Sequence, residues 1–449
     1  MSGYVPNTWE EQSKMLSELG YHHMEELFND IPDSLKLKTD MDLPKSMSEI
    51  ELKKHMQSLA NKNRNIEDNA CFLGAGAYDH YIPSTVDYVL NRGEFYTAYT
   101  PYQPEISQGT LQSIFEYQTM ICELTGMEIS NASIYDGATA LTEAALMACG
   151  VTRRQEVLVA SNVHPEARQV LNTYASCRGI KVTEIAHKEG IVDLDLLKKA
   201  LSNDVSAVIV QTPNFFGFIE QIQPIIELVH EYKALFIAYV DPISLSILTP
   251  PGNFGADIVV GEGQALGNPL GFGGPYLGFF ATTRKLMRKM PGRVVGETHD
   301  LDGKRGFVLT LQTREQHIRR DKATSNICSN QNLNALAAAV YMSTLGKCGI
   351  REVAKLSLNK AHYLFEKLVS IQGVEPAFRD SPVFFKEFPL SISIPPLKLN
   401  KKLLEYNIIG GYELSSVYPE ISNGWLIAVT EKRTKDEMDR LVEKVGELV

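Results

Sequence analysis

The sequence reads ADIVVGEGQALG from Ala256 to Gly267. Its first five residues form an apolar run that is typical of a buried strand, and the glycines that follow permit a tight turn. A second glycine-rich run, Gly271–Pro275, comes shortly afterwards. Neither run contains a lysine. This turn therefore supplies no primary amine, whatever site it helps to build.

Apolar runs of strand length occur on both sides of this turn, and stretches long enough for a crossover helix separate most of them. This alternation predicts an α/β fold with a mostly parallel sheet that helices cover on both faces. The crossovers are expected to be right-handed. The seven predicted strands are Ala132–Tyr135, Glu156–Ser161, Lys181–Ile185, Val205–Gln211, Leu235–Val240, Asp257–Val260 and Leu277–Thr282.

The chain divides into three parts by pattern. Residues 1–69 are rich in charge and predict a helical arm, with one helix over Met47–Asn61. Residues 70–325 contain the predicted strands and form a large α/β domain. Residues 326–449 form a small C-terminal α+β domain together with its connecting helix. That long helix is predicted to begin near Ser325–Asn326, and strands at Phe384–Ser393 and Gly424–Thr430 and a final helix at Thr434–Leu448 follow it.

Composition excludes several classes of function. The 449 residues include 44 basic and 54 acidic side chains and carry a net charge of −10, without a long basic run. Nucleic acid and anionic membranes are therefore not expected partners. The six cysteines are dispersed and form no C-x-x-C pair, so neither a zinc site nor a disulfide framework is indicated. Free thiols and the lack of a signal or membrane-spanning pattern predict a cytoplasmic protein.

Two long motifs point to a family. The first reads NRGEFYTAYTPYQPEISQG from Asn91 to Gly109, and the second reads REQHIRRDKATSNIC from Arg314 to Cys328. Together with Gly261–Gln264 and Phe272–Ala281, they resemble the P-protein of the glycine cleavage system, glycine dehydrogenase (decarboxylating). The resemblance runs over nearly the whole chain and is to the N-terminal half of the P-protein. In many bacteria that half is a separate chain, called subunit 1 or alpha.

The resemblance implies a fold and a reaction. The fold is the aspartate-aminotransferase-like fold (fold type I) of pyridoxal-phosphate enzymes, with a mostly parallel seven-stranded sheet and a smaller C-terminal domain. The complex joins glycine to pyridoxal phosphate as a Schiff base, releases CO2 and passes the aminomethyl group to the lipoyl arm of the H-protein. The partner chain, subunit 2 (beta), resembles this one but keeps the lysine, and an α2β2 heterotetramer is the expected assembly.

The resemblance places the missing amine. The Schiff-base lysine position falls near Ala265, and its neighbouring histidine position falls near Gln264. A methyl group cannot form an imine, so no catalytic residue is expected in this chain. Lys285 lies beyond the next strand and Lys322 lies in a later loop, and neither is well placed as a replacement. Pyridoxal phosphate is therefore expected on the partner subunit.

Two further positions match cofactor contacts of the family. Asp241 follows the strand Leu235–Val240, where a carboxylate normally pairs with the pyridinium nitrogen. The alternative is an acid that caps Ser244 or the turn, which we favour without the lysine. His164 matches the ring-stacking position, although a histidine beside a proline is more often structural. We interpret both residues as vestigial.

The phosphate cradle is also altered. Tyr135–Leu141 turns from strand to helix, and Gly137 and Thr139 are the vestigial cradle residues. Asp136 stands where the active half has a small neutral residue. An acid there is a good helix N-cap, but it would repel a dianionic phosphate. This pocket is therefore expected to hold no cofactor.

The chain could still complete the partner's active site, because sites of this fold lie at a subunit interface. The tyrosine-rich segment offers aromatic faces and hydroxyl groups, and the expected start of the long helix offers hydroxyl and free N–H groups to an anion. The nearby cations Arg314, Arg319, Arg320 and Lys322 provide positive potential for a phosphate or for an acidic H-protein, or they are a solvated loop. The predicted partner contacts are Tyr96, Tyr99, Thr100, Tyr102, Gln103, Glu105, Gln108, Thr324, Ser325 and Asn326.

Three interpretations of function remain open at this stage. The chain is an obligatory subunit of a decarboxylating pyridoxal-phosphate enzyme, inactive alone, which is the interpretation we favour. It is instead an independent pyridoxal-phosphate enzyme, which would require a lysine. Or it is a scaffold or H-protein docking subunit with no part in the active site.

Overall fold

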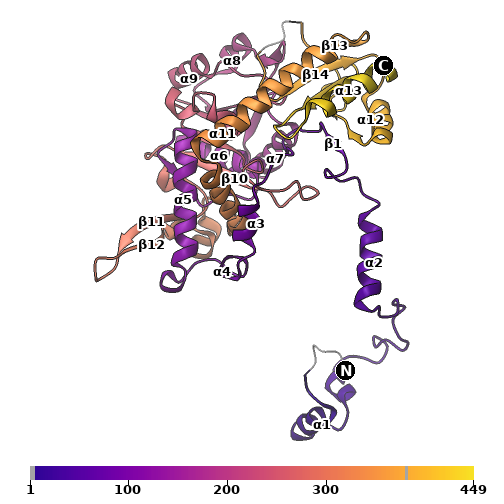
Figure 1. Cartoon of the computed structure of the whole chain (residues 1–449). Coiled ribbons are helices and arrows are strands. Elements are labelled where there is room, and N and C mark those ends of the chain that lie inside the picture. The colour runs from indigo at the N-terminus through magenta and orange to yellow at the C-terminus, as the bar shows by residue number, and fades with distance from the viewer. Residues whose placement is uncertain (1–5, 380–382) are drawn as a thin grey trace. The chain divides into compact units, whose positions relative to one another are not determined.

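A computed structural model of the chain describes residues 6–379 and 383–449. The chain separates into two compact units, residues 1–64 and residues 65–449. Figure 1 shows the ribbon of both units.

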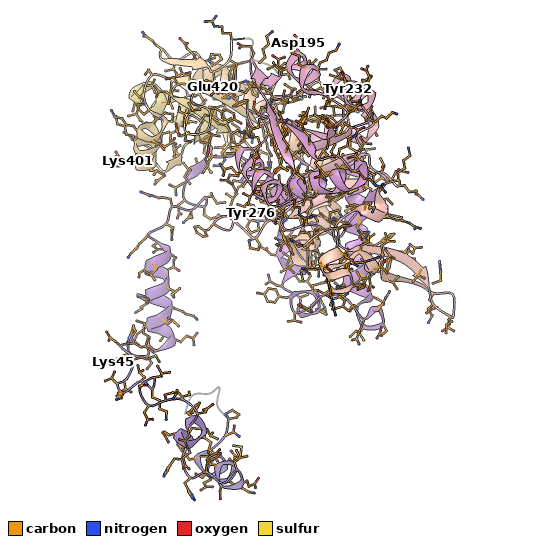
Figure 2. All side chains as sticks on the ribbon, turned by 180° about the vertical axis from the view of Figure 1, so that it is seen from behind. Lys45, Asp195, Tyr232, Tyr276, Lys401 and Glu420 are labelled. Carbon is orange, nitrogen blue, oxygen red and sulfur yellow. The ribbon has the colours of Figure 1, made fainter. Side chains whose placement is uncertain are left out.

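The first unit contains two α-helices, α1 (Trp9–Glu18) and α2 (Glu49–Ala60), and a 3₁₀ turn at Met24–Phe28. The predicted helix over Met47–Asn61 is thus confirmed as α2. Capping boxes begin both α-helices, from Thr8 with Glu11 and from Ser48 with Glu51, and they satisfy backbone N–H groups that a helix start leaves free. Side chains project all round α2 (Figure 2), and none of them is buried.

The second unit is built on a seven-stranded sheet with the strand order β2-β10-β9-β8-β7-β3-β4. The neighbours from β9 to β4 run parallel, whereas β10 runs antiparallel to both β9 and β2. The mostly parallel seven-stranded sheet is therefore confirmed. Its strands are β2 (Ile129–Ser130), β3 (Glu156–Ala160), β4 (Lys181–Ile185), β7 (Val205–Thr212), β8 (Leu235–Val240), β9 (Ile258–Glu262) and β10 (Gly278–Thr282).

The first predicted strand, Ala132–Tyr135, is wrong. The strand lies earlier, at β2, and only Ile134 makes a single bridge, to Gly278. The chain leaves the sheet because the Asn131 side chain accepts a hydrogen bond from the Ser133 N–H, and Ser133 has a φ of 107°. A side-chain turn of this kind competes with strand pairing.

Helices pack on this sheet and connect its strands. The central helix α6 (Gly137–Thr152) contacts β7, β8, β9 and β10 and is buried along most of its length. A small antiparallel ribbon, β5 (His187–Lys188) with β6 (Ile191–Val192), follows β4. The other helices are α3 (Ser84–Leu90), α4 (Gly93–Tyr96), α5 (Gln108–Thr125), α7 (Pro165–Ser176), α8 (Leu194–Ala200), α9 (Ile222–Glu231) and α10 (Gln316–Arg319).

The long helix α11 runs over Asn332–Leu368 and has a break at Gly346. The prediction that it begins near Ser325–Asn326 is wrong. Residues before Asn332 are held as a loop because their polar groups bond to other segments. The Cys328 N–H donates to the Tyr135 hydroxyl, and the Asn330 amide donates to the Ala132 carbonyl.

A second sheet with the order β13-β14-β17-β16 follows α11 and has its own apolar core, which includes Trp425, Phe388 and Leu441. The predicted strands at Phe384–Ser393 and Gly424–Thr430 correspond to β14 and β17, and the predicted final helix corresponds to α13. The elements are β13 (Val374–Pro376), β14 (Glu387–Ile392), α12 (Pro396–Leu403), β16 (Tyr412–Glu413), β17 (Gly424–Ala428) and α13 (Lys435–Leu448).

Two smaller features complete the second unit. Strand β1 (Ala70–Cys71) pairs in parallel with β15 (Ile408–Ile409) and brings the following residues, 72–81, across the second sheet to the first. A hairpin of β11 (Val294–His299) and β12 (Arg305–Thr310) projects from the body of the unit (Figure 1) and packs at its base against α5. Among the described residues, no helix is long and apolar enough to cross a membrane.

Candidate functional site

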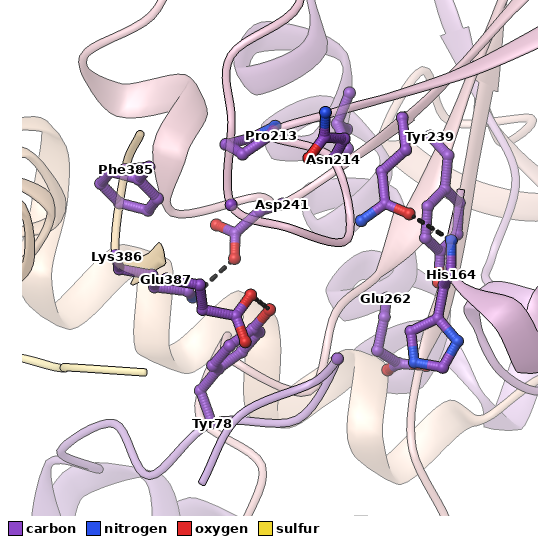
Figure 3. Close-up of a pocket in the computed structure, with 14 residues that line it drawn as sticks. Tyr78, His164, Pro213, Asn214, Tyr239, Asp241, Glu262, Phe385, Lys386 and Glu387 are labelled. Carbon is purple, nitrogen blue, oxygen red and sulfur yellow. Dashed lines mark hydrogen bonds and ion pairs between the residues drawn. The ribbon is translucent and has the colours of Figure 1, made fainter. Parts of the chain in front are cut away.

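A small pocket lies where the carboxyl ends of β7 and β8 meet β14 of the second sheet (Figure 3). Its volume is about 30 Å³, which is enough for roughly one water molecule. Asp241, directly after β8, and His164, at the start of α7, both line it. The structure thus brings together two of the residues that the sequence analysis singled out, and Gly137 lies next to a third lining residue, Glu262.

Asp241 already has a cation. The Lys386 ammonium lies 2.5 Å from its carboxylate, and the Asp241 carboxylate also accepts a hydrogen bond of 2.9 Å from the Ser244 N–H. Only 2% of the Lys386 side chain is exposed. Burial, the largest single influence, raises the pKa of Asp241, but the charge and hydrogen bond of Lys386, the Ser244 N–H and the nearby His80 together outweigh it, so the net pKa shift is downward. Asp241 is therefore a paired carboxylate that caps the following turn.

Lys386 is held on its other sides as well. Its ammonium lies 3.5 Å from the ring centroid of Tyr78 and 3.0 Å from Nε2 of His80. The His80 Nδ1 atom is 2.6 Å from Glu431. These contacts fix the lysine amine at the carboxylate, on the side of the pocket where a pyridinium nitrogen would sit. An imine carbon is para to that nitrogen, so this amine is at the wrong end of the site to form an imine.

The neighbouring Glu387 fastens residues 75–78 over the same pocket. Its carboxylate accepts hydrogen bonds from the Tyr78 hydroxyl at 2.6 Å and from the Ala75 N–H at 2.7 Å. Burial raises the pKa of Glu387 to about 7. Gln264 holds the segment from the other side, because its side chain bonds both the N–H and the carbonyl of Tyr78.

The start of α6 is also occupied. The Glu262 carboxylate accepts hydrogen bonds from the N–H groups of Gly137, Gln264 and Leu277, at 2.8, 3.0 and 3.0 Å. Burial raises the pKa of Glu262 to about 7, although these N–H groups lower it. The Asp136 side chain accepts the Thr139 N–H at 2.7 Å. A helix start binds anions well in general, but here the N–H groups of Gly137 and Thr139 are already bonded to two carboxylates of the chain itself.

Gly137 at this helix start is packed closely against the chain itself, and the open hollow beside it, of about 630 Å³, is lined by the Asp136 and Glu262 side chains. A Cβ atom added at Gly137 would lie 2.5 Å from the Tyr239 hydroxyl and 2.9 Å from the Glu262 backbone nitrogen. The cradle glycine therefore permits a close approach of the chain to itself. The residues of this pocket do not fit pyridoxal phosphate, because its cationic and its anionic positions are both filled.

His164 acts as a structural residue in this arrangement. Its Nε2 atom lies 2.9 Å from the Ala75 carbonyl, and its Nδ1 atom accepts the Glu166 N–H at 3.2 Å. These partners require a neutral ring that carries its proton on Nε2, and burial lowers the pKa of His164 in agreement. The ring packs edge-on against Phe215. A group that is fixed on three sides is not free to stack on a ligand.

The position of the missing amine is buried. Ala265 is 3% exposed in the turn after β9, and its neighbour Gln264 is bonded to Tyr78 as described. Lys285 and Lys322 are both exposed and neither lines the pocket. Lys386 was missed in the sequence analysis, although a Lys-Glu pair inside the apolar run from Phe384 to Phe388 was a signal for a buried ionic site.

The tyrosine-rich segment lies on the surface of the second unit. Tyr96, Tyr99 and Tyr102 are 64%, 85% and 47% exposed, and Gln103 and Glu105 are exposed as well. Three exposed aromatic rings so close in sequence are typical of a surface that another molecule covers.

Several of the predicted partner contacts bond within the chain, among them Gln108, Thr100 and Tyr102. Gln108 braces the β11–β12 hairpin by accepting the Phe307 N–H and donating to the Phe307 carbonyl. The Thr100 hydroxyl accepts a hydrogen bond from the side chain of Arg293. Arg293 is a buried residue that was not predicted from the sequence.

The segment 324–326 is a loop, so a helix start cannot present these residues to an anion. Thr324 and Asn326 are exposed and line a hollow with Arg320, whereas Ser325 is buried and its hydroxyl accepts the Ile327 N–H. Of the cations nearby, Arg314 donates to the carbonyls of Leu311 and Gly292, and the rest are exposed. Among the described residues, no cluster of His, Cys, Asp and Glu could hold a metal ion.

The sheet order and the position of the pocket define a class of protein, the fold type I enzymes of pyridoxal phosphate. Structural comparison agrees: a sphingosine-1-phosphate lyase of Burkholderia pseudomallei aligns with a TM-score of 0.64 over 93% of this chain and 94% of its own, at 13% identity. At that identity the likeness concerns the fold alone.

Within this class, residues 2–445 match the family described as Glycine cleavage system P-protein, and the chain belongs to that family. It is 57% identical over 443 residues to the probable glycine dehydrogenase (decarboxylating) subunit 1 of Carboxydothermus hydrogenoformans, with 99% of each chain covered. It is 54% identical over 445 residues to the protein of the same name from Desulfitobacterium hafniense, again with 99% of each covered. A crystal structure of glycine decarboxylase (P-protein) in inhibitor-bound form aligns with a TM-score of 0.92 and 44% identity, and covers 99% of this chain and 100% of that one.

Proposed function

We propose that this chain is the subunit of the P-protein that does not carry the cofactor. With a homologous subunit 2 it forms an enzyme that decarboxylates glycine and passes the aminomethyl group to the lipoyl arm of the H-protein. Pyridoxal phosphate is bound covalently by the lysine of subunit 2. The chain is inactive alone, and an α2β2 assembly is expected.

The observation that carries this proposal is the filled pocket. Lys386 supplies the positive charge beside Asp241, and the Glu262 carboxyl group occupies the N–H groups at the start of α6. A cofactor would have to displace both groups and leave them unpaired, and burying an unpaired charge costs several kcal/mol. Ala265 offers no covalent bond to offset that cost. Asp241, His164, Gly137 and Thr139 thus keep positions of a cofactor site but serve the fold.

The exposed segments give the chain a part in the partner's site. The aromatic side chains of Tyr96, Tyr99 and Tyr102 are half to largely exposed. Polar groups of Thr324 and Asn326 lie beside Arg320. We propose that these residues, with Gln103 and Glu105, reach the active site of subunit 2. The exposed cations Arg319, Arg320 and Lys322 supply positive potential for a phosphate or for an acidic H-protein.

Absorbance tests where the cofactor lies. The chain and subunit 2 are purified separately and together in the presence of pyridoxal phosphate, and the visible absorbance of lysine-bound cofactor is recorded. The proposal expects no such band from the isolated chain, and it expects glycine-dependent CO2 exchange with H-protein only from the complex. A band from the isolated chain would instead support an independent enzyme.

A purely scaffolding role is the second candidate, and the exposed residues distinguish it. Tyr99→Phe and Thr324→Ala are surface changes that leave the fold intact. A tenfold or larger loss of exchange activity, on the order of 1.4 kcal/mol per factor of ten, is expected if they reach the active site. Full activity of both variants in the assembled complex would favour the scaffold.

A further inference from the structure

Arg293 is a buried arginine whose role the fold alone does not explain. It precedes β11, and only 4% of its side chain is exposed. A buried guanidinium is costly unless its donors find partners, so the partners show what it is for.

All four terminal N–H donors of Arg293 go to loops. Its Nη1 atom donates to Thr100 Oγ1 at 3.3 Å and to Ser329 Oγ at 2.8 Å. Its Nη2 atom donates to the Tyr102 hydroxyl at 2.8 Å and to the Cys328 carbonyl at 2.9 Å. One side chain thus joins two loop segments that are more than two hundred residues apart in sequence, and each overlaps or adjoins one of the two family motifs.

The arginine is itself anchored to the main sheet. Its carbonyl accepts the Ala132 N–H at 2.8 Å, directly after β2, and Gly292 before it lies where a Cβ would meet the Asn131 side chain at 2.9 Å. Gly292 has a φ of 76°, in the left-handed region that favours glycine. Arg293 therefore fixes both loops relative to the edge of the main sheet.

The exposed face of this cluster is a hollow of about 570 Å³ that Tyr102, His317, Arg320 and Cys328 line. The Arg293 guanidinium lies 5.1 Å from the Tyr102 ring centroid, and Glu315 lies 3.5 Å from both Arg293 and His317. The Tyr102 and His317 rings meet edge-on. Arg293 thus lies beneath the hollow and fixes the positions of the Tyr102 and His317 rings that line it.

We infer that Arg293 is a positioning residue of the assembled enzyme, which holds Tyr102 and the 328–329 loop in the geometry that the partner's active site requires. This inference rests on the proposed function. Loops held by one shared side chain gain conformational freedom when it is shortened, and misplaced groups lower the rate even when assembly persists.

The test uses the complex of the full chain with subunit 2. Arg293→Lys keeps the charge but cannot reach four acceptors. It is expected to lower kcat/KM for glycine by at least about tenfold, with complex size and cofactor content unchanged. The matched control is Arg433→Lys, an equally buried arginine that pairs with Asp79 instead. The control is expected to retain activity within about twofold per assembled complex.

A double-mutant cycle separates positioning from general stability. Tyr102→Phe removes the hydroxyl that Arg293 holds, and its effect should vanish in the Arg293→Lys background because both changes break the same contact. Additive losses, or a loss no greater than that of Arg433→Lys, would overturn the inference. If Arg293→Lys does not assemble, Tyr102→Phe and Ser329→Ala decide: a loss in both supports it, and full activity in both overturns it.

Amide hydrogen exchange in the isolated chain tests the effect of Arg293 on the two loops independently of the proposed function. In the isolated chain, Arg293→Lys should speed amide exchange in residues 97–103 and 324–330, and Arg433→Lys should not. Faster exchange together with a wild-type complex that lacks glycine activity would refute the proposed function and leave only the ordering of the two loops by Arg293 standing. Unchanged exchange in both segments refutes the positioning role.

Discussion

At the scale of single residues, Lys386 and Glu262 distinguish this pocket from a cofactor-binding site. Each occupies, from within the chain, a position that pyridoxal phosphate would need: Lys386 places its ammonium beside Asp241, and Glu262 places its carboxyl group at the start of α6. Neither was predicted from the sequence, because Lys386 lies 145 residues beyond Asp241 and only the packing of the two sheets brings them together. Asp241 and His164 both line the pocket because each closely follows a strand that the apolar pattern predicts.

The ion pair predicts a stability effect. Lys386→Met leaves Asp241 buried without its cation, which is expected to cost about 3–5 kcal/mol in urea unfolding. Adding Asp241→Asn should recover part of the loss, because it removes the unpaired charge. The control Lys435→Met breaks an exposed pair with Asp439 and should cost under about 1 kcal/mol. Equal losses in Lys386→Met and Lys435→Met would contradict a buried, paired lysine.

Glu387 predicts a dependence on pH. Its pKa rises from 4.5 to about 7 on folding, so the folded chain keeps a proton that the unfolded chain releases. The resulting stabilisation is fully present below pH 4.5 and is lost as the pH rises to about 7. Glu387→Gln does not titrate, and it can keep the Ala75 bond by accepting with its oxygen and the Tyr78 contact by donating from its amide nitrogen. Between pH 4.5 and 7.5, unfolding in urea should show a loss of stability about 2 kcal/mol larger in wild type than in the variant. Parallel pH profiles would rule this out.

At the scale of elements, most of the exposed candidate contact residues lie in loops and not in helices or strands. The sequence pattern predicted six of the seven main strands and the final helix, since periodicity reports burial. It failed at Ala132–Tyr135, where the side-chain turn at Asn131 ends the strand, and at the start of α11, where long-range bonds to Arg293, Ala132 and the Tyr135 hydroxyl override local preference. Such bonds depend on residues distant in sequence, which no local pattern reveals.

The β11–β12 hairpin provides a prediction at this scale. Gln108→Ala removes the side chain that bonds both backbone groups of Phe307, so amide exchange in residues 294–310 should accelerate by the equivalent of about 1–2 kcal/mol. Gln112→Ala, one turn further along α5 and exposed, is the matched control. An equal response to both changes would show that Gln108 does not brace the hairpin.

The whole molecule consists of two units of different character. Among residues 6–64 only Leu16 is buried, whereas residues 65–449 contain three apolar clusters. We propose that the first 69 residues act as an arm, separate from the domain of the main sheet and the domain of the second sheet. Brief trypsin treatment of the isolated chain should cut after Lys62 or Arg64, both exposed, and leave a stable fragment that begins near Asn65. Cleavage distributed throughout the chain would contradict this division.

Peptide mapping of the assembled enzyme tests the central claim most directly. The complex of this chain with subunit 2 is reduced with borohydride in the presence of pyridoxal phosphate, digested and examined by mass spectrometry for lysines that carry the reduced cofactor. The filled pocket predicts a single modified lysine, located in subunit 2. Cofactor attached to Lys386, or to any other lysine of this chain, would contradict it.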